Sequence, residues 1–168
     1  MNRAFIKDPD DTGQPEQLPE RPQSPHPNYV TPRGLAQLQA EASALTARRD
    51  HLVAEGKLAD PLDLATVQRD LRYVEGRLQR AILVVPDGLP LARVRFGCAV
   101  EVCDEAGQVA TYTLVGEDEA DPAQGKLSWV SPLAEVLLHA EEGDEVVWRR
   151  PAGTQRLEIL AIRPGAPD

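Results

Sequence analysis

Apolar residues recur at alternating three- and four-residue steps in two segments of this 168-residue chain, which a short turn separates. The first segment contributes Leu35, Leu38, Ala42, Leu45 and Leu52, with Arg49 in its one polar position. The second contributes Leu64, Val67, Leu71, Val74, Leu78 and Ala81. This spacing places an apolar stripe along one side of each helix, and two such stripes close against each other. The pattern predicts an antiparallel coiled-coil hairpin over residues 31–85, with residues 56–63 exposed at its far end.

Residues that favour helix starts precede both predicted helices. Thr31 is a suitable N-cap for the first helix and is followed by Pro32, which fits the first helical position. Asp60 and Pro61 repeat this arrangement before the second helix, and Asp63 adds a negative charge to its first turn. The second helix is predicted to run to about Val84. Helices of about 24 residues would carry the turn about 35 Å outward.

The pattern changes to strand-like alternation after Pro86-Asp87-Gly88, a sequence that favours a break between domains. Strands are predicted at residues 93–96, 99–102, 110–115, 127–130, 145–148 and 156–162, and a short helix at residues 133–139. Residues 86–168 are therefore predicted to form an α+β domain: an antiparallel sheet with one helix.

Residues 1–30 contain six prolines and few residues that could be buried, which predicts an extended or disordered leader. An alternative for residues 24–30 is a docking strand, because Tyr29 and Val30 could pack against an apolar core.

Charge and composition narrow the class of partner. The net charge is −9, and residues 86–168 hold seven basic and fifteen acidic residues. Such an acidic domain disfavours tight autonomous binding to duplex DNA, which depends on neutralising phosphates, and suits a protein partner. No apolar stretch is long enough to span a membrane, and no secretory signal is evident. Cys98 and Cys103 would point to opposite faces of a strand, so we expect reduced thiols in a cytoplasmic protein.

A collinear series of short segments resembles the GreA/GreB family of transcript cleavage factors over about residues 29–163. The segments are residues 94–97, 112–121, 131–134, 143–144 and 151–153 in the sheet domain, and residues 31–35 and 75–78 in the hairpin. The resemblance implies an FKBP-like C-terminal domain and a bacterial RNA polymerase as partner. It also implies docking at the rim of the polymerase secondary channel, with the coiled coil inside the channel near nascent RNA and DNA. Such a factor would be a monomer without enzymatic activity of its own.

The turn departs from the family pattern. In the family, two carboxylates at the tip help to hold a Mg²⁺ ion that is shared with the polymerase active site. Ungapped alignment places the first acid on Lys57 and the second on Asp60, while Asp63 replaces a later glutamate and Leu64 a tyrosine. The expectation is therefore an elongation regulator with weak or no cleavage stimulation and no cofactor of its own.

Two other functions remain open at this point. In one, Asp60 and Asp63 recruit the Mg²⁺ ion and the protein is an active cleavage factor. In the other, the protein is an adaptor that binds a partner outside the channel. Lys57 could contact phosphate, RNA or an active-site carboxylate, or could simply be solvated.

Two further sets of candidate residues follow. The acidic run at residues 117–121 could be a solvated loop, which is usual for charge runs, but the resemblance implies a polymerase-docking surface at Asp118, Glu119, Ala120, Asp121, Ser131 and Pro132. Basic residues of the hairpin are candidates for contact with nucleic acid or the channel wall, or else serve solubility: Arg48, Arg49, Arg69 and Arg72.

Overall fold

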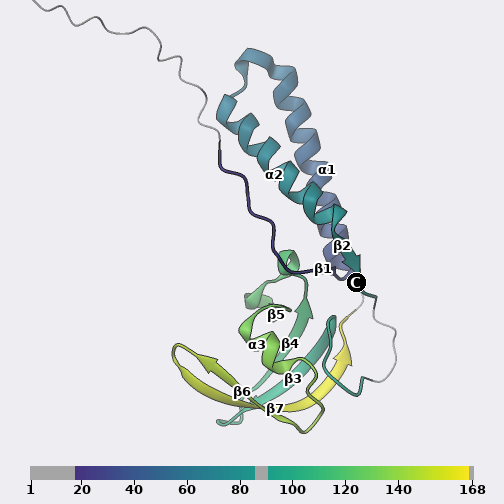
Figure 1. Cartoon of the computed structure of the whole chain (residues 1–168), viewed down its shortest axis with the longest axis vertical. Helices are drawn as coiled ribbons and strands as arrows, with labels where there is room; N and C mark the ends of the chain where they lie inside the picture. Colours follow the sequence, from purple (N-terminus) through teal and green to yellow (C-terminus); the bar gives the residue numbers. More distant parts are fainter. Residues whose placement is uncertain (1–17, 86–90, 167–168) are drawn as a thin grey trace, which may run out of the picture.

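The computed structural model describes residues 18–85 and 91–166, in which a helical hairpin stands on a β domain (Figure 1). The predicted disorder of residues 1–17 and the predicted break at residues 86–88 lie outside these ranges. The α+β class, with a hairpin followed by a sheet domain that carries one short helix, is confirmed. Within the described residues, no helix is both long and apolar enough to cross a membrane.

The hairpin consists of α1 (Pro32–Glu55), the 3₁₀ turn η1 (Gly56–Leu58) and α2 (Pro61–Gln79). Both predicted N-caps are confirmed: the Thr31 side chain accepts a hydrogen bond from the Gly34 amide, and Asp60 accepts one from the Leu62 amide. The apolar stripes face each other, and their most buried members are Leu38, Leu52, Val67, Leu71 and Val74. Local capping and periodicity thus account for most of the hairpin.

The prediction that the second helix continues to about Val84 is wrong. α2 ends at Gln79, and Ala81–Leu83 form strand β2, which pairs in parallel with β1 (Asn28–Val30). The Val84 amide extends this pairing with a bond of 2.9 Å to the Val30 carbonyl. Strand β1 therefore provides hydrogen-bond partners for the backbone of residues 81–84, which in a longer helix would have bonded within the helix.

The β domain contains a five-stranded sheet in the order β5-β4-β3-β7-β6. Its strands are β3 (Cys98–Asp104), β4 (Val109–Val115), β5 (Lys126–Ser128), β6 (Glu145–Arg150) and β7 (Gly153–Pro164). Helix α3 (Pro132–Leu137) packs on the sheet (Figure 1), and Leu133, Ala134 and Leu137 join the strand residues in one apolar core.

Two details of the predicted sheet need correction. Residues 93–96 form no strand, because the backbone of buried Val94 bonds instead to Ala140 and His139, which follow α3. The sheet is also not wholly antiparallel, since β4 and β5 are parallel. The connection between them contains the 3₁₀ turns η2 (Glu117–Glu119) and η3 (Pro122–Gln124), and it returns the chain so that β5 runs beside the last three residues of β4, Thr113–Val115.

Candidate functional site

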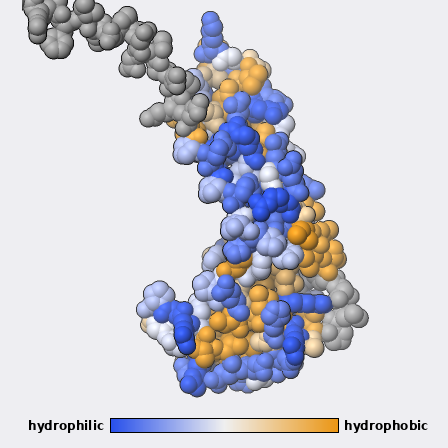
Figure 2. Space-filling model, viewed as in Figure 1, coloured by the Kyte–Doolittle hydropathy of each residue, from blue (hydrophilic) through white to orange (hydrophobic). Residues whose placement is uncertain are grey.

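The hairpin tip presents a cation and apolar groups. Gly56 adopts φ 59°, a left-handed conformation that glycine tolerates, and so ends α1 sharply before η1. Lys57 is exposed and makes no hydrogen bond or ion pair with any residue in the described ranges. Leu58 is 92% exposed, and Val53 and Leu62 are also exposed, so apolar surface surrounds the turn (Figure 2).

Both tip carboxylates already have structural partners. Asp60 Oδ1 accepts a hydrogen bond of 2.9 Å from the Leu62 amide, which caps α2. Asp63 Oδ2 lies 2.5 Å from Arg48 Nη2, in an ion pair that joins the two helices just below the tip. Across residues 18–85 and 91–166, no three side chains of the metal-ligating types converge. Asp60 and Asp63 are each used in a structural contact at the start of α2.

Each of the four predicted contact arginines is paired with an acid of the same chain. The pairs and their N–O distances are Arg48–Asp63 at 2.5 Å, Arg49–Asp50 at 2.8 Å, Arg69–Asp70 at 2.9 Å and Arg72–Glu20 at 2.5 Å. In each pair the acid offsets the positive charge of its arginine. Their contact with nucleic acid or a channel wall stays a prediction.

The residues of the predicted docking surface make contacts within the protein. Asp118 and Glu119 face the base of the hairpin, where Glu119 accepts a hydrogen bond from Thr31, the N-cap of α1. Asp121 caps η3, Ser131 caps α3, and Pro132 begins that helix. Ala120 is half-buried between η2 and Asp121. A role for these six residues in docking stays a prediction, but Asp118 and Glu119 also hold the hairpin and the β domain together.

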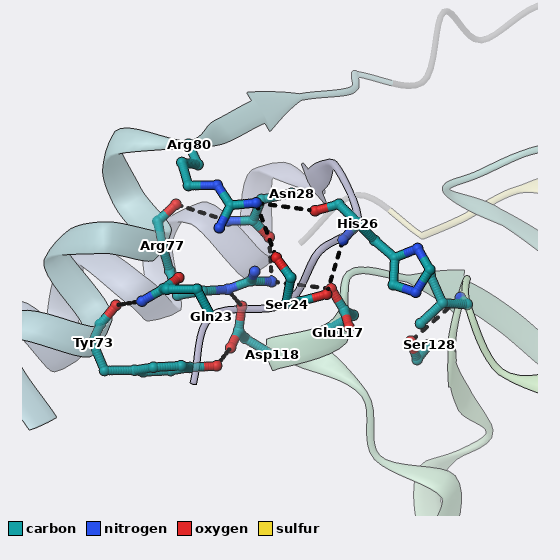
Figure 3. Close-up of polar contacts among 11 residues, drawn as sticks. Gln23, Ser24, His26, Asn28, Tyr73, Arg77, Arg80, Glu117, Asp118 and Ser128 are labelled. Carbon is teal, nitrogen blue, oxygen red and sulfur yellow. Dashed lines mark hydrogen bonds and ion pairs between the residues drawn. The ribbon is translucent and has the colours of Figure 1, made fainter. Parts of the chain in front are cut away.

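The residue that joins these parts is Arg77, in the last turn of α2. Its side chain is fully buried. Arg77 Nε donates to Asp118 Oδ2 at 2.7 Å, and Nη2 donates to Asn28 Oδ1 at 2.5 Å and lies 3.4 Å from Glu117 Oε2 (Figure 3). Asn28 also donates to the Arg77 carbonyl at 2.7 Å. Arg77 thus links the leader, α2 and η2.

Tyr73 extends this junction along α2. Its hydroxyl donates to Asp118 Oδ1 at 3.0 Å. Partial burial, together with the nearby Asp118 carboxylate, raises the pKa of Tyr73, so the phenol stays protonated and able to donate. The sequence contained one signal for the junction: Arg77 follows directly on Gly76 at the edge of the apolar stripe, where a charged side chain needs a partner.

Comparison with known proteins finds relatives of this chain. Residues 89–164 match the family model described as transcription elongation factor, GreA/GreB, C-term. Transcription elongation factor GreB of Neisseria meningitidis serogroup B is 34% identical over 151 residues, an alignment that covers 80% of this chain and 93% of that protein. Transcription elongation factor GreA of Hyphomonas neptunium is 34% identical over 149 residues and covers 79% and 95%.

Among solved structures, the GreA/GreB factor of Nitrosomonas europaea shares 23% identity at a TM-score of 0.41, covering 81% of this chain and 98% of that one. The GreA factor homolog Gfh1 of Thermus thermophilus shares 20% identity at a TM-score of 0.40, covering 82% and 99%. With a GreB relative that matches most of both chains, the protein belongs to the GreA/GreB family of transcription elongation factors.

Proposed function

We propose that this protein binds RNA polymerase at the secondary channel, places its hairpin tip near the active site, and modulates elongation with weak or no stimulation of transcript cleavage. Family membership and a 24-residue α1, about 36 Å long, support the placement. The observation that carries the proposed activity is Lys57, which is exposed, has no partner among the described residues, and stands where the family register expects a carboxylate.

The charge at this position decides whether the tip can share a metal ion. Two unit charges about 4 Å apart interact by about 4 kcal/mol at an effective dielectric constant near 20. Replacing a carboxylate by an ammonium turns this attraction for Mg²⁺ into repulsion. The remaining register acid, Asp60, caps α2 through Oδ1, and Asp63 is paired with Arg48 through Oδ2, so each carboxylate already has one oxygen bonded within the protein. Any Mg²⁺ ion at Asp60 would be one that the polymerase holds, and the residues here add little to its binding.

The test measures RNA cleavage in stalled elongation complexes of purified bacterial RNA polymerase, with and without the protein. We expect the wild-type protein to bind the core polymerase and to leave cleavage close to its intrinsic rate. Lys57→Asp restores the first tip acid and is expected to raise the cleavage rate about tenfold, which corresponds to about 1.4 kcal/mol. Leu58→Ala is the matched control, because it alters the neighbouring exposed side chain without changing charge.

Asp60→Asn separates the metal alternative from helix capping, since asparagine also caps helices but is uncharged. Strong cleavage by the wild-type protein that Asp60→Asn abolishes would show that Asp60 recruits the metal and would overturn the modulatory proposal. If the protein does not co-elute with core polymerase, both the modulatory proposal and the cleavage-factor alternative are rejected, and the adaptor alternative is favoured.

A further inference from the structure

The leader continues along the hairpin before it reaches β1, and residues 18–27, here called the leader strap, lie beside α2 (Figure 1). Glu20 pairs with Arg72 at 2.5 Å, and the Arg21 guanidinium lies 3.8 Å from the centre of the Tyr73 ring. Gln23 Nε2 donates to the Tyr73 carbonyl at 3.0 Å. Arg21 also pairs with Asp70 at 3.5 Å, and Arg80 contacts Ser24, so the contacts span residues 70–80, about three helical turns.

A glycine on α2 accommodates the strap. A Cβ atom added to Gly76 would lie 2.8 Å from Gln23 Nε2, closer than a non-bonded contact allows. Arg80, one turn further on, donates to the Ser24 carbonyl at 2.9 Å (Figure 3). The strap therefore contacts residues on both sides of Gly76: Tyr73 before it and Arg80 after it.

The same leader also contacts the β domain. The ring centres of Tyr29 and Trp129 are 5.1 Å apart, those of Tyr29 and Phe96 are 5.8 Å apart, and His26 meets Trp129 edge-on at 6.0 Å. Aromatic pairs at these distances contribute beyond the area they bury. One continuous segment thus contacts both the hairpin and the β domain.

Arg77 lies where the two sets of contacts meet. Its fully buried guanidinium donates hydrogen bonds to Asn28 of the leader and to Asp118 of the β domain. A buried cation is costly unless its partners keep their geometry, so rotation of the hairpin about its base would carry a large penalty. The hydrogen bonds of Asn28 and Asp118 to Arg77 therefore oppose movement of α2 relative to the leader and the β domain.

We propose that the leader strap and β1 form a clamp that fixes the angle between the hairpin and the β domain, with Arg77 as its positioning residue. The consequence for activity rests on the proposed function, in which the β domain docks and the tip reaches the active site. A rotation of about 10° at the base would move a tip about 36 Å away by about 6 Å. Misplacement by even about 1 Å can cost a reacting site much of its rate.

The test measures the distance between tip and β domain in the isolated full-length protein by pulsed EPR. Spin labels are attached at Ala54→Cys and Thr111→Cys, both exposed positions, in a Cys103→Ser background that leaves buried Cys98 in place. Asn28→Ala removes both of its bonds to Arg77, Arg77→Met removes the buried cation, and the double variant Arg21→Ala/Gln23→Ala weakens only the strap. Arg156→Ala, which breaks an exposed ion pair inside the β domain, is the control.

We expect a narrow distance distribution in the wild-type protein and in Arg156→Ala, and a distribution about twofold broader in Asn28→Ala and in the strap double variant. An unchanged width in both would overturn the clamp. If Arg77→Met does not fold, the double variant Arg21→Ala/Gln23→Ala still tests the clamp, because the side chains of Arg21 and Gln23 lie at the surface. Unfolding midpoints recorded in parallel separate loss of stability from loss of orientation. No polymerase is present, so failure of the clamp and failure of the proposed function are separate results.

Discussion

At the scale of single residues, two glycines allow the leader to lie close to the rest of the protein at the base of the hairpin. Gly116 follows β4, and a Cβ atom there would lie 2.5 Å from the Tyr29 carbonyl oxygen. At Gly76 the same added atom would meet the amide of Gln23, the far end of a flexible side chain. The two glycines therefore differ in what must move to admit a methyl group: the main chain of β1 in one case and one surface side chain in the other.

Gly116→Ala is expected to lower the free energy of unfolding by about 1–3 kcal/mol, because the leader strand must shift away from the β domain. Gly76→Ala adds the same methyl group but gains up to about 1 kcal/mol of helix propensity, so its net cost should be small. Urea unfolding followed by circular dichroism compares the two. Equal losses of stability would show that the leader does not seat closely on Gly116.

At the scale of elements, the start of α2 combines structure with candidate chemistry. Asp60 accepts the Leu62 amide, Pro61 occupies the first helical position, and Asp63 pairs with Arg48 across the hairpin. Helix capping explains the presence of Asp60, and the ion pair with Arg48 explains that of Asp63, so neither residue requires a metal ion as its reason. Their effect on helix stability can therefore be measured separately from any effect on transcription.

Asp60→Ala should destabilise the protein by about 1 kcal/mol through loss of the cap, whereas Asp60→Asn should cost only a few tenths of that. For a protein of this size the alanine variant corresponds to a fall in melting temperature of about 2–4 °C, measurable by calorimetry. A melting temperature that falls equally in both variants would assign the effect to the charge of Asp60 rather than to capping.

At the scale of the whole molecule, the leader joins two parts that sequence patterns describe separately. Its outermost described ion pair is Glu20–Arg72. The hydrogen bond from Arg72 lowers the pKa of Glu20 below its ordinary value of 4.5, and the charge of Arg69 acts in the same direction. A carboxyl with a lowered pKa stabilises the attached strap above its unattached pKa, and this contribution is lost as the pH falls through the lowered value.

We therefore expect the strap to stay attached at neutral pH and to loosen only below about pH 4.5, the ordinary value for Glu20. A spin label at Leu18→Cys would report this release as increased mobility during an acid titration. In Glu20→Gln the part of the transition due to this carboxyl should disappear. Release near pH 7 in the wild-type protein would contradict an attachment that depends on Glu20.

The predictions that succeeded rest on neighbouring residues. Thr31 and Asp60 cap their helices because an N-cap needs only the next few residues, and the register that places Lys57 at the tip follows from the spacing around it. Most of the strands of the β domain and its short helix were found in the same way. Residues 93–96 were not, since alternation alone cannot show that Val94 bonds to the loop after α3 instead of a strand.

By itself, the sequence determined the hairpin, its caps, the α+β class and the family, because periodicity, capping and motif order are local properties of the chain. Only the tertiary structure decided that α2 stops for β2, that Asp118 and Glu119 face the hairpin, and that Arg77 is buried among them. These contacts join residues about 40 to 90 positions apart. Burial and charge pairing at such separations depend on how the finished elements pack, which no local pattern specifies.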